Sequence, residues 1–581
     1  MKLFFLLLLC CTALQGTAQN RWYNPMETDT PPIWGRCPNM AGSRTYHRLP
    51  DSMQPQVRPA LWNLSTNSAG LSVRFYTNAP SITVKYTVKG NRSMPHMPAT
   101  GVSGVDLYTT DCNGQQQWCA GRYAFGDTIT YTYTQLGYTN NHPHGNAYTL
   151  YLPLYTELTH LQIGVPGTAE FRFITPPDEK PIVVYGTSIT HGACASRPGM
   201  SWTNQVERAL DWPLVNLGFS GNGLLEEPLF EQMAQTPARV YVIDCLPNLV
   251  DGREAWIKPR LLAGIKRLRN ASDTPILLVE HNGYEGVAPT PAGRARYERP
   301  NRILRALYDS LRQCIPALYY LSREEIAFSP DNQVDGVHPT DLGMTEYAGA
   351  YTRTLRKLIY PVTANTAFAA CRQRREAGGY EWYERHREIN RYVRQTQPEV
   401  VLIGNSITHY WGGAPDSRRS AGQTVWDDLF GGMRVANLGC GWDYIENVLW
   451  RIQHGELEGY KARHVFVHIG TNNLHKDTDN RIVDGICQLV QAIRHYQPEA
   501  QIHVCAIYPR RGQEKRLARL NRLLKKRLSH EPHTDYMDVR DLLTGKNGQV
   551  DETLFRDGLH PNAKGYQKLV PRYRQVLNGN K

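Results

Sequence analysis

The chain has 581 residues and a formal net charge of +12, with 41% hydrophobic and 20% charged residues. One hydrophobic core does not extend over this length, so about three domains are expected. The composition is that of an ordinary globular protein, which excludes a disordered or fibrous chain.

The N-terminal residues have the pattern of an export signal. Lys2 precedes an apolar run over residues 3–9, and small residues at positions 16 and 18 stand before a cleavage position at Gln19. We therefore expect residues 1–18 to be a signal peptide and the protein to be periplasmic or secreted.

Membrane attachment is the less favoured alternative. Processing as a lipoprotein at Cys10 or Cys11 would need a small preceding residue, and Leu9 is not small. The apolar run of the signal is too short to span a bilayer, and no later segment reaches the roughly 18 apolar residues of a membrane helix. No transmembrane segment is expected.

Residues 19–176 contain short runs that alternate apolar and polar side chains, rich in Thr, Tyr and Val and separated by Asn, Gly and Pro. The clearest runs are residues 71–76, 81–88, 128–133 and 148–152. Many short strands without helical spacing predict a β-sandwich, which could bind glycan through surface aromatic residues or only support its neighbour. Cys112 and Cys119 lie close in a loop-like stretch, and an exported protein could pair them.

Strand-like and helix-like segments alternate over residues 177–361 and again over residues 396–581. The first region predicts strands at 182–185, 239–243 and 275–279 and helices at 204–210, 256–268 and 302–313. The second predicts strands at 400–403, 435–437, 464–469 and 501–507 and helices at 516–528 and 564–577. Residues 362–395 between them are expected to be a linker leading into a charged helix at 381–394. Each region predicts a mainly parallel sheet covered by helices, so a whole domain is repeated.

The most basic stretch, residues 515–527, alternates Lys and Arg with Leu at helical spacing. It could bind nucleic acid or an anionic glycan. The favoured interpretation is an amphipathic surface helix on a sheet, so no nucleic acid partner is expected. No His or Cys cluster has metal-binding spacing, and His142-Pro143-His144 is interpreted as a loop.

Two stretches of the repeated regions are nearly alike. Residues 183–191 and 401–409 each contain an apolar run that ends in Gly-x-Ser, at Ser188 and Ser406. An Asp-Gly-x-His-Pro sequence follows far downstream in each region, beginning at Asp335 and at Asp557. Serine becomes a nucleophile when an imidazole accepts its proton and a carboxylate orients that imidazole. The pattern therefore predicts two esterase-type sites, although a polar turn ahead of a helix would also explain each Asp-Gly-x-His-Pro.

Two further blocks follow strands in each region, in the same order. Residues 216–221 correspond to residues 437–442, and Pro247-Asn248 corresponds to residues 470–473. These blocks place backbone N–H groups and an amide side chain where a tetrahedral oxyanion needs donors, each worth about 3 kcal/mol.

On these four blocks, both regions resemble the SGNH (GDSL-type) hydrolases. The second region is similar to the branch that resembles platelet-activating-factor acetylhydrolase, and the first to a bacterial branch that follows a β-rich N-terminal domain. The resemblance implies two flavodoxin-like three-layer α/β/α hydrolase domains, at residues 177–361 and 396–581. It also implies hydrolysis of small esters through an acyl-enzyme, with no cofactor and no metal.

The resemblance implies a role for each matched residue. The nucleophile, base and orienting carboxylate would be Ser188, His338 and Asp335 in the first site and Ser406, His560 and Asp557 in the second. The oxyanion donors would be the N–H groups of Ser188 and Gly221 with the Asn248 side chain, and the N–H groups of Ser406 and Trp442 with the Asn472 side chain.

The chain departs from the family pattern at three places. Thr187 and Asn405 stand where an Asp usually follows the first glycine. Trp442 replaces a glycine in the second site, and Pro247 changes how Asn248 is presented in the first. We therefore expect two related but non-identical sites.

The resulting hypothesis is an exported carbohydrate esterase that removes O-acetyl groups at two serine sites. One alternative is a hydrolase of lipids or small acyl esters. Another is a glycan-binding protein in which a hydrolase domain is degenerate. The sequence does not specify the oligomeric state.

Overall fold

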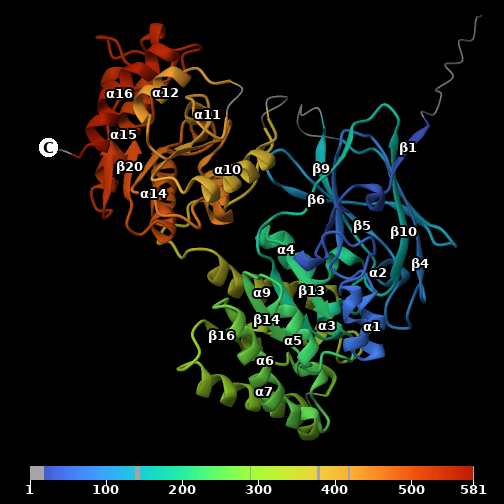
Figure 1. Ribbon diagram of the computed structural model, residues 1–581. Coiled ribbons are helices and arrows are strands. Elements are labelled where there is room, and N and C mark those ends of the chain that lie inside the picture. Colours follow the sequence, from blue (N-terminus) through green and yellow to red (C-terminus); the bar gives the residue numbers. More distant parts are fainter. Residues whose placement is uncertain (1–18, 138–143, 288, 376–379, 417–418, 580–581) are drawn as a thin grey trace, which may run out of the picture.

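The computed structural model describes residues 19–137, 144–287, 289–375, 380–416 and 419–579. The predicted signal peptide, Cys10 and Cys11, and His142-Pro143 lie outside these residues. Figure 1 shows a β-rich N-terminal part beside a first α/β unit, with a second α/β unit joined to them near α10. Within the described chain, none of the helices is long and apolar enough to cross a membrane.

The N-terminal part consists of two antiparallel sheets. One sheet has the order β1 (Asn20–Tyr23), β10 (Glu157–Pro166), β4 (Ile82–Lys89), β8 (Ile129–Tyr133) and β7 (Arg122–Ala124). The other has the order β11 (Phe171–Phe173), β3 (Ser72–Thr77), β9 (Asn146–Tyr151), β5 (Asp106–Thr110) and β6 (Gln116–Cys119), with β2 (Ile33–Trp34) on β3. Alternate residues of both sheets, such as Phe75 and Val84, form one buried cluster. This packing confirms the predicted β-sandwich.

Cys112 and Cys119 are not bonded, contrary to the pairing that the sequence allowed. All cysteines of the described residues are free thiols. In the β5–β6 hairpin Thr110 pairs with Gln116 and Cys119 pairs with Leu107, so Cys119 lies three residues along the returning strand while Cys112 lies in the turn. Three residues of strand span about 10 Å, which exceeds the reach of a disulfide.

The first α/β unit has a parallel sheet in the order β13 (Leu214–Gly218), β12 (Ile182–Gly186), β14 (Val240–Asp244), β15 (Ile276–Val279) and β16 (Leu318–Leu321). The helices α4 (Trp202–Leu210) and α9 (Asp341–Ile359) cover one face. The helices α5 (Glu227–Ala234), α6 (Ile257–Ala271) and α7 (Pro291–Leu311) cover the other. Successive residues of β12 point to opposite faces, because Val184 packs with the first set and Val183 with the second. The N-terminal part adds Leu61 of α1 (Pro59–Ser65) and Val102 of α2 (Ala99–Val102) to these cores.

The second α/β unit repeats this arrangement. Its sheet has the order β18 (Val435–Gly439), β17 (Val400–Gly404), β19 (His464–His468), β20 (Gln501–Cys505) and β21 (Thr534–Met537). The helices α12 (Gln423–Phe430) and α16 (Ala563–Leu577) pack on one face. The helices α10 (Trp382–Thr396), α13 (Ile445–Arg451), α14 (Asp479–Tyr496) and α15 (Glu514–Leu528) pack on the other. Strand order 2-1-3-4-5 in both units is flavodoxin-like, which confirms the predicted three-layer fold.

The described residues between the two α/β units are packed against both. The buried ring of Phe368 belongs to the core of the second unit. The Arg372 side chain donates a 2.6 Å hydrogen bond to Asp211 of the first unit, and the Arg374 N–H donates to the Cys112 carbonyl of the sandwich at 2.8 Å. This segment therefore joins all three parts through direct contacts.

A buried arginine from the preceding chain covers the edge strand of each parallel sheet. Arg48 donates from Nη1 to the carbonyl oxygens of Asn216 (3.2 Å) and Gly218 (2.6 Å) on β13. Arg385 of α10 donates from Nε to Gly439 (2.8 Å) and from Nη2 to Asn437 (3.3 Å) on β18. The outward carbonyls of an edge strand lack a neighbouring strand, and each arginine supplies the missing donors.

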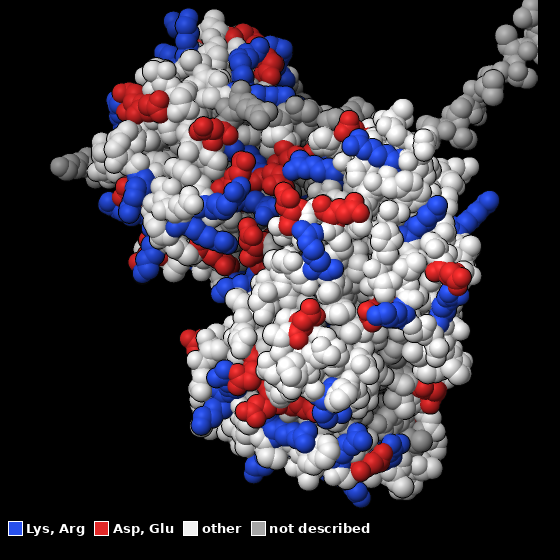
Figure 2. Space-filling view, turned by 45° about the vertical axis from the view of Figure 1, so that its right-hand side comes forward, with Lys and Arg blue, Asp and Glu red and all other residues white. Residues whose placement is uncertain are grey.

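The basic helix α15 packs on the sheet through Leu517, Leu520 and Leu524. Its Arg516 and Arg519 side chains form ion pairs with Asp479 of α14. On the face drawn in Figure 2, basic and acidic side chains are interspersed. These contacts are those of an amphipathic surface helix.

The buried His468 on β19 should make the second unit sensitive to acid. Burial lowers its pKa to about 3, and neither ring nitrogen has a hydrogen-bond partner among the described residues. Because the unfolded chain then binds the proton more tightly between pH 6.5 and 3, stability falls as the pH falls through that window. We expect this residue alone to cost about 2 kcal/mol at pH 5.

Urea unfolding at pH 7 and pH 5, followed by tryptophan fluorescence, measures this effect. Between pH 7 and pH 5, the free energy of unfolding of His468→Leu should fall by about 2 kcal/mol less than that of the unaltered protein. The exposed control His530→Leu should lose as much stability as the unaltered protein. Equal acid sensitivity of all three proteins would contradict the prediction.

Candidate active sites

Each candidate nucleophile lies at the first turn of a short helix that follows the first strand of its α/β unit. Ser188 begins α3 (Ser188–His191) after β12, and Ser406 begins α11 (Ser406–His409) after β17. The side chains of the preceding residues cap these helices, since Thr187 Oγ1 accepts from the Ile189 N–H and Asn405 Oδ1 from the Ile407 N–H. Thr and Asn are both good N-cap residues, so each fills the capping role that an Asp would fill at this position.

In the first site, the three predicted residues form one chain of hydrogen bonds. His338 Nε2 lies 2.8 Å from Ser188 Oγ, and His338 Nδ1 lies 2.7 Å from Asp335 Oδ2. The second oxygen of Asp335 accepts from the His338 backbone N–H at 2.8 Å, which fixes the short loop on which both residues lie.

The second site repeats this geometry. Ser406 Oγ lies 2.8 Å from His560 Nε2, and His560 Nδ1 lies 2.7 Å from Asp557 Oδ2. The His560 backbone N–H donates to Asp557 Oδ1 at 2.8 Å. Both serines are buried, with 5% and 7% of their surface exposed.

Both orienting carboxylates are held in the ionised form. Burial raises the pKa of Asp335, but the backbone and ring hydrogen bonds from His338 lower it more, so the pKa lies below its ordinary value. The same causes, with His560 as the donor, lower the pKa of Asp557. A carboxylate bound to Nδ1 leaves Nε2 of each imidazole to accept the serine proton.

The backbone offers N–H donors beside each serine. Ser188 and Ser406 are first residues of helices, so their N–H groups have no partner within the helix. The N–H groups of Gly221 and Trp442 form no hydrogen bond with another described residue. Gly221 and Trp442 also share a left-handed backbone conformation, with φ of 67° and 63°. The structure therefore brings the matched donor positions of both halves into the same conformation.

The two candidate amide donors are anchored differently. Asn248 Oδ1 accepts from the Gly223 N–H at 3.0 Å, so this bond leaves its Nδ2 group unused. Asn472 Nδ2 donates to the Asp443 carbonyl at 3.0 Å and keeps its second N–H. By contrast, Asn216 and Asn437 of the same blocks are structural, because each donates to the carbonyl of Thr190 or Thr408 in the nucleophile helix.

A cavity of about 390 Å³ opens over the second site. It is lined by Ser406, Tyr410, Arg419, Trp442, Asn472, Arg510, Arg556, Asp557, Leu559 and His560. The Trp442 side chain is 50% exposed, although its backbone is strained for a residue with a bulky side chain. In the first site a side chain at Gly221 would meet open space. The indole is thus an addition to the rim of the second site.

The strain at Trp442 predicts opposite results for two truncations. Trp442→Gly removes the side chain and the left-handed cost, whereas Trp442→Ala removes the side chain and keeps a cost of about 1 kcal/mol. The glycine variant should therefore be more stable than the alanine variant by about 1 kcal/mol. Thermal unfolding of the two variants tests this order, and a more stable alanine variant would contradict it.

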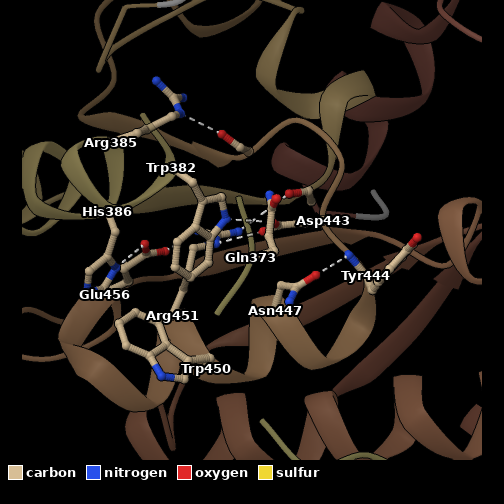
Figure 3. Close-up of polar contacts among 12 residues, drawn as sticks. Gln373, Trp382, Arg385, His386, Asp443, Tyr444, Asn447, Trp450, Arg451 and Glu456 are labelled. Carbon is tan, nitrogen blue, oxygen red and sulfur yellow. Dashed lines mark hydrogen bonds and ion pairs between the residues drawn. The ribbon is translucent and has the colours of Figure 1, made fainter. Parts of the chain in front are cut away.

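The loop that carries Trp442 is held by a polar network, and Figure 3 draws the part of it around Gln373, Asp443 and Arg451. Gln373 Nε2 donates to the Gly441 carbonyl at 2.9 Å, and Arg375 Nη2 donates to the Trp442 carbonyl at 3.0 Å. The Asp443 carboxylate accepts from Trp382 Nε1 at 2.7 Å and from Arg451 Nε at 2.8 Å. The loop is therefore positioned from residues that precede the second α/β unit as well as from inside it.

Arg451 is the centre of this network. Its guanidinium contacts Asp443 and Glu456, and the side chains of all three residues are fully buried. His386 Nδ1 lies 2.7 Å from Glu456 Oε1. Sequence analysis did not single out these residues. No local pattern shows that Arg451 meets two carboxylates.

The first site has different neighbours. The His96 ring of the N-terminal part lies 5.7 Å from the His338 ring. The Cys194 sulfur and a ring nitrogen of each histidine, atoms that could bind a metal, lie within 4.8 Å of one another. Both ring nitrogens of His338 are engaged by Ser188 and Asp335, and burial raises the pKa of Cys194 to about 12. A neutral thiol and an occupied imidazole are poor metal ligands, so this cluster fits the serine chemistry better than a metal.

Comparison with known proteins gives three family matches. The GDSL-like lipase/acylhydrolase family matches residues 179–356 and, through a second model of that description, residues 402–568. Residues 20–171 match the model of the N-terminus of SGNH-hydrolase-type esterases.

Individual relatives agree with these matches. The platelet-activating factor acetylhydrolase IB subunit alpha1 of Bos taurus is 29% identical over 205 residues, which are 34% of this chain and 84% of that protein. The alpha2 subunit of Rattus norvegicus is 29% identical over 204 residues, 34% of this chain and 85% of that protein. The crystal structure of a Bacteroides ovatus protein assigned to the GDSL-like lipases is 30% identical, with a TM-score of 0.54, over 59% of this chain and 98% of that chain.

Proposed function

Because the chain belongs to the GDSL-like lipase/acylhydrolase family, we propose that it removes O-acetyl groups from carbohydrates at two serine sites. The observation that carries the proposal is the complete Ser–His–Asp chain of hydrogen bonds in both halves, with matched distances of 2.8 and 2.7 Å. Two intact sites count against the alternative of a glycan-binding protein with a degenerate hydrolase domain.

The proposed reaction has two steps at each site. Ser188 Oγ or Ser406 Oγ attacks the ester carbonyl while the imidazole Nε2 takes its proton, and the carboxylate stabilises the imidazolium. The oxyanion accepts hydrogen bonds from the serine N–H, from the N–H of Gly221 or Trp442, and from the Asn248 or Asn472 side chain. The imidazolium then protonates the sugar oxygen that leaves. Water, activated by the same imidazole, releases acetate from the acyl-enzyme.

The polarity of the second pocket supports a small acyl group on a polar alcohol. Sites for long acyl chains are lined mainly by apolar side chains, whereas most residues around Ser406 are polar or charged. The expected signal peptide and the β-sandwich in front of the hydrolase units agree with a carbohydrate substrate outside the cytoplasm.

The proposal is tested by acyl-chain and substrate selectivity. We expect p-nitrophenyl acetate to be hydrolysed faster than the octanoate, and acetate to be released from acetylated polysaccharides. A fluorophosphonate should label Ser188 and Ser406, as read from peptide masses. Preference for octanoate, or absence of label on both serines, would overturn the proposal.

The second candidate substrate is an acetylated phospholipid, because relatives named platelet-activating factor acetylhydrolase match a third of the chain. Faster acetate release from acetylated phospholipid than from acetylated polysaccharide would favour this candidate.

A further inference from the structure

Three arginines surround the second serine and come from separate loops. Arg419 follows α11, Arg510 follows β20, and Arg556 directly precedes Asp557; all three line the cavity with Ser406 and His560. Tyr410 is close to the base and to two of these arginines, since its ring is 5.6 Å from the His560 ring, 5.7 Å from the Arg556 guanidinium and 5.9 Å from the Arg419 guanidinium.

The positive charge of this cavity is not balanced by its own carboxylates. Asp557 is the acidic residue of the lining, and it is engaged by His560. Among the described residues, Arg510 and Arg556 form no ion pair; Arg510 Nη1 donates to the Thr471 carbonyl at 3.1 Å. The adjacent Arg511, in contrast, is paired with Glu552 at 2.6 Å. Two guanidinium groups therefore remain to attract an anion in a concave site.

The first site lacks this charge at the matching positions. The Asp-Gly-x-His-Pro repeat aligns Arg556 with the uncharged Val334.

Arg510 is aligned through a shared hydrogen-bond pair. The Asn521 amide bonds both backbone groups of Ile507, and the Asn301 amide bonds both backbone groups of His281. Counting three residues onward aligns Arg510 with Tyr284. Arg510 and Arg556 of the second site thus correspond to uncharged residues of the first.

We propose that the second site is selective for acetyl esters whose alcohol carries a carboxylate, as in a uronic acid residue, and that the first site is not. The inference rests on the proposed function and assigns different substrates to the two sites. Arginine is suited to this role because its planar guanidinium can bind a carboxylate through two parallel hydrogen bonds. The alcohol part of the ester would lie toward Arg510 and Arg556, beside Trp442.

The first test separates the sites and varies only the charge of a small ester. The full chain with Ser188→Ala reports the second site, and the chain with Ser406→Ala reports the first. The probes are 4-acetoxybenzoate and its uncharged methyl ester. The anion preference of a site is its kcat/KM for 4-acetoxybenzoate divided by its kcat/KM for the methyl ester. We expect this preference to be at least tenfold larger at the second site than at the first, and to shrink at high salt.

Variants that copy the first site provide the matched control. In the Ser188→Ala background, Arg510→Tyr with Arg556→Val should reduce the anion preference about tenfold, mainly through the KM for the anionic probe. Arg556→Val alone should give an intermediate loss, which guards against misfolding of the double variant. Arg527→Gln, which alters an arginine on α15 paired with Asp484, should change nothing.

Polymeric and binding measurements complete the test. Acetylated polygalacturonate should lose acetate faster than acetylated xylan at the second site only. Calorimetric titration of the unaltered chain should detect D-glucuronate but not D-glucose, and the double arginine variant should lose that binding. The titration does not depend on turnover.

The outcomes separate the two proposals. If the Ser188→Ala chain hydrolyses p-nitrophenyl acetate but treats both benzoate probes alike, the selectivity inference is overturned and the proposed function stands. If that chain is inactive, the proposed function fails at this site, and absence of glucuronate binding would also overturn the inference. Preference for an acetylated phosphodiester lipid in vesicles over acetylated polygalacturonate would overturn the carboxylate assignment.

Discussion

Replacing Ser188 and Ser406 together with alanine is expected to reduce hydrolysis of p-nitrophenyl acetate by roughly 10⁴-fold or more. Each serine lies 2.8 Å from the imidazole that would take its proton, and removing the nucleophile leaves only the oxyanion donors. Each single variant should retain the activity of the other site. The sum of the two single-variant rates should therefore match that of the unaltered protein.

The measurement is steady-state release of p-nitrophenol by purified protein. Ser529→Ala, an exposed serine at the end of α15, is the matched control and should keep full activity. Activity close to the unaltered level in the double variant would show that neither serine is the nucleophile.

Replacing Arg451 with methionine is expected to have the largest effect on stability. The substitution keeps a long side chain but leaves Asp443 and Glu456, both fully buried, without their cation. Breaking a buried ion pair from one side costs about 3–5 kcal/mol, because the remaining charge is uncompensated. The backbone carbonyl of Asp443 also accepts a hydrogen bond from the Asn472 side chain, which is a candidate oxyanion donor. The second site should therefore lose activity while the first site keeps it.

Thermal unfolding and kinetics in the two single-site backgrounds test this prediction. Arg574→Met is the matched control, since it breaks an exposed ion pair with Asp428 and should cost less than about 1 kcal/mol. Adding Asp443→Asn and Glu456→Gln to Arg451→Met should recover part of the stability. Equal destabilisation by the two methionine variants would refute a central role for Arg451.

The sequence predicted features that depend on short stretches of chain. The strand expected at 182–185 is found at Ile182–Gly186, and the helix expected at 381–394 is found at Trp382–Thr396. The serine, histidine and aspartate of each half could be paired because parallel strands place their carboxyl ends at one edge of the sheet.

Features that depend on remote contacts were not predictable. Arg48 meets Asn216 across 168 positions, and Arg372 meets Asp211 across 161. The local sequence around each arginine does not reveal these contacts. The partners of Arg48 are backbone carbonyls, which every residue has, and the side-chain partner of Arg372 is one distant carboxylate. The arginines of the second pocket come from three loops and have no shared spacing, so only the folded chain brings them together.

The arginines that donate to the edge strands limit where this chain can be cut into stable fragments. Arg385 belongs to α10, so a fragment that starts at β17 would leave the outward carbonyls of β18 bare. An uncovered edge is a template on which strands of other molecules can add. Such a fragment is expected to aggregate, although it holds Ser406, Asp557 and His560. A fragment that begins before Gln373 would keep the Arg385 hydrogen bonds to β18 and the Gln373 hydrogen bond to the loop that carries Trp442.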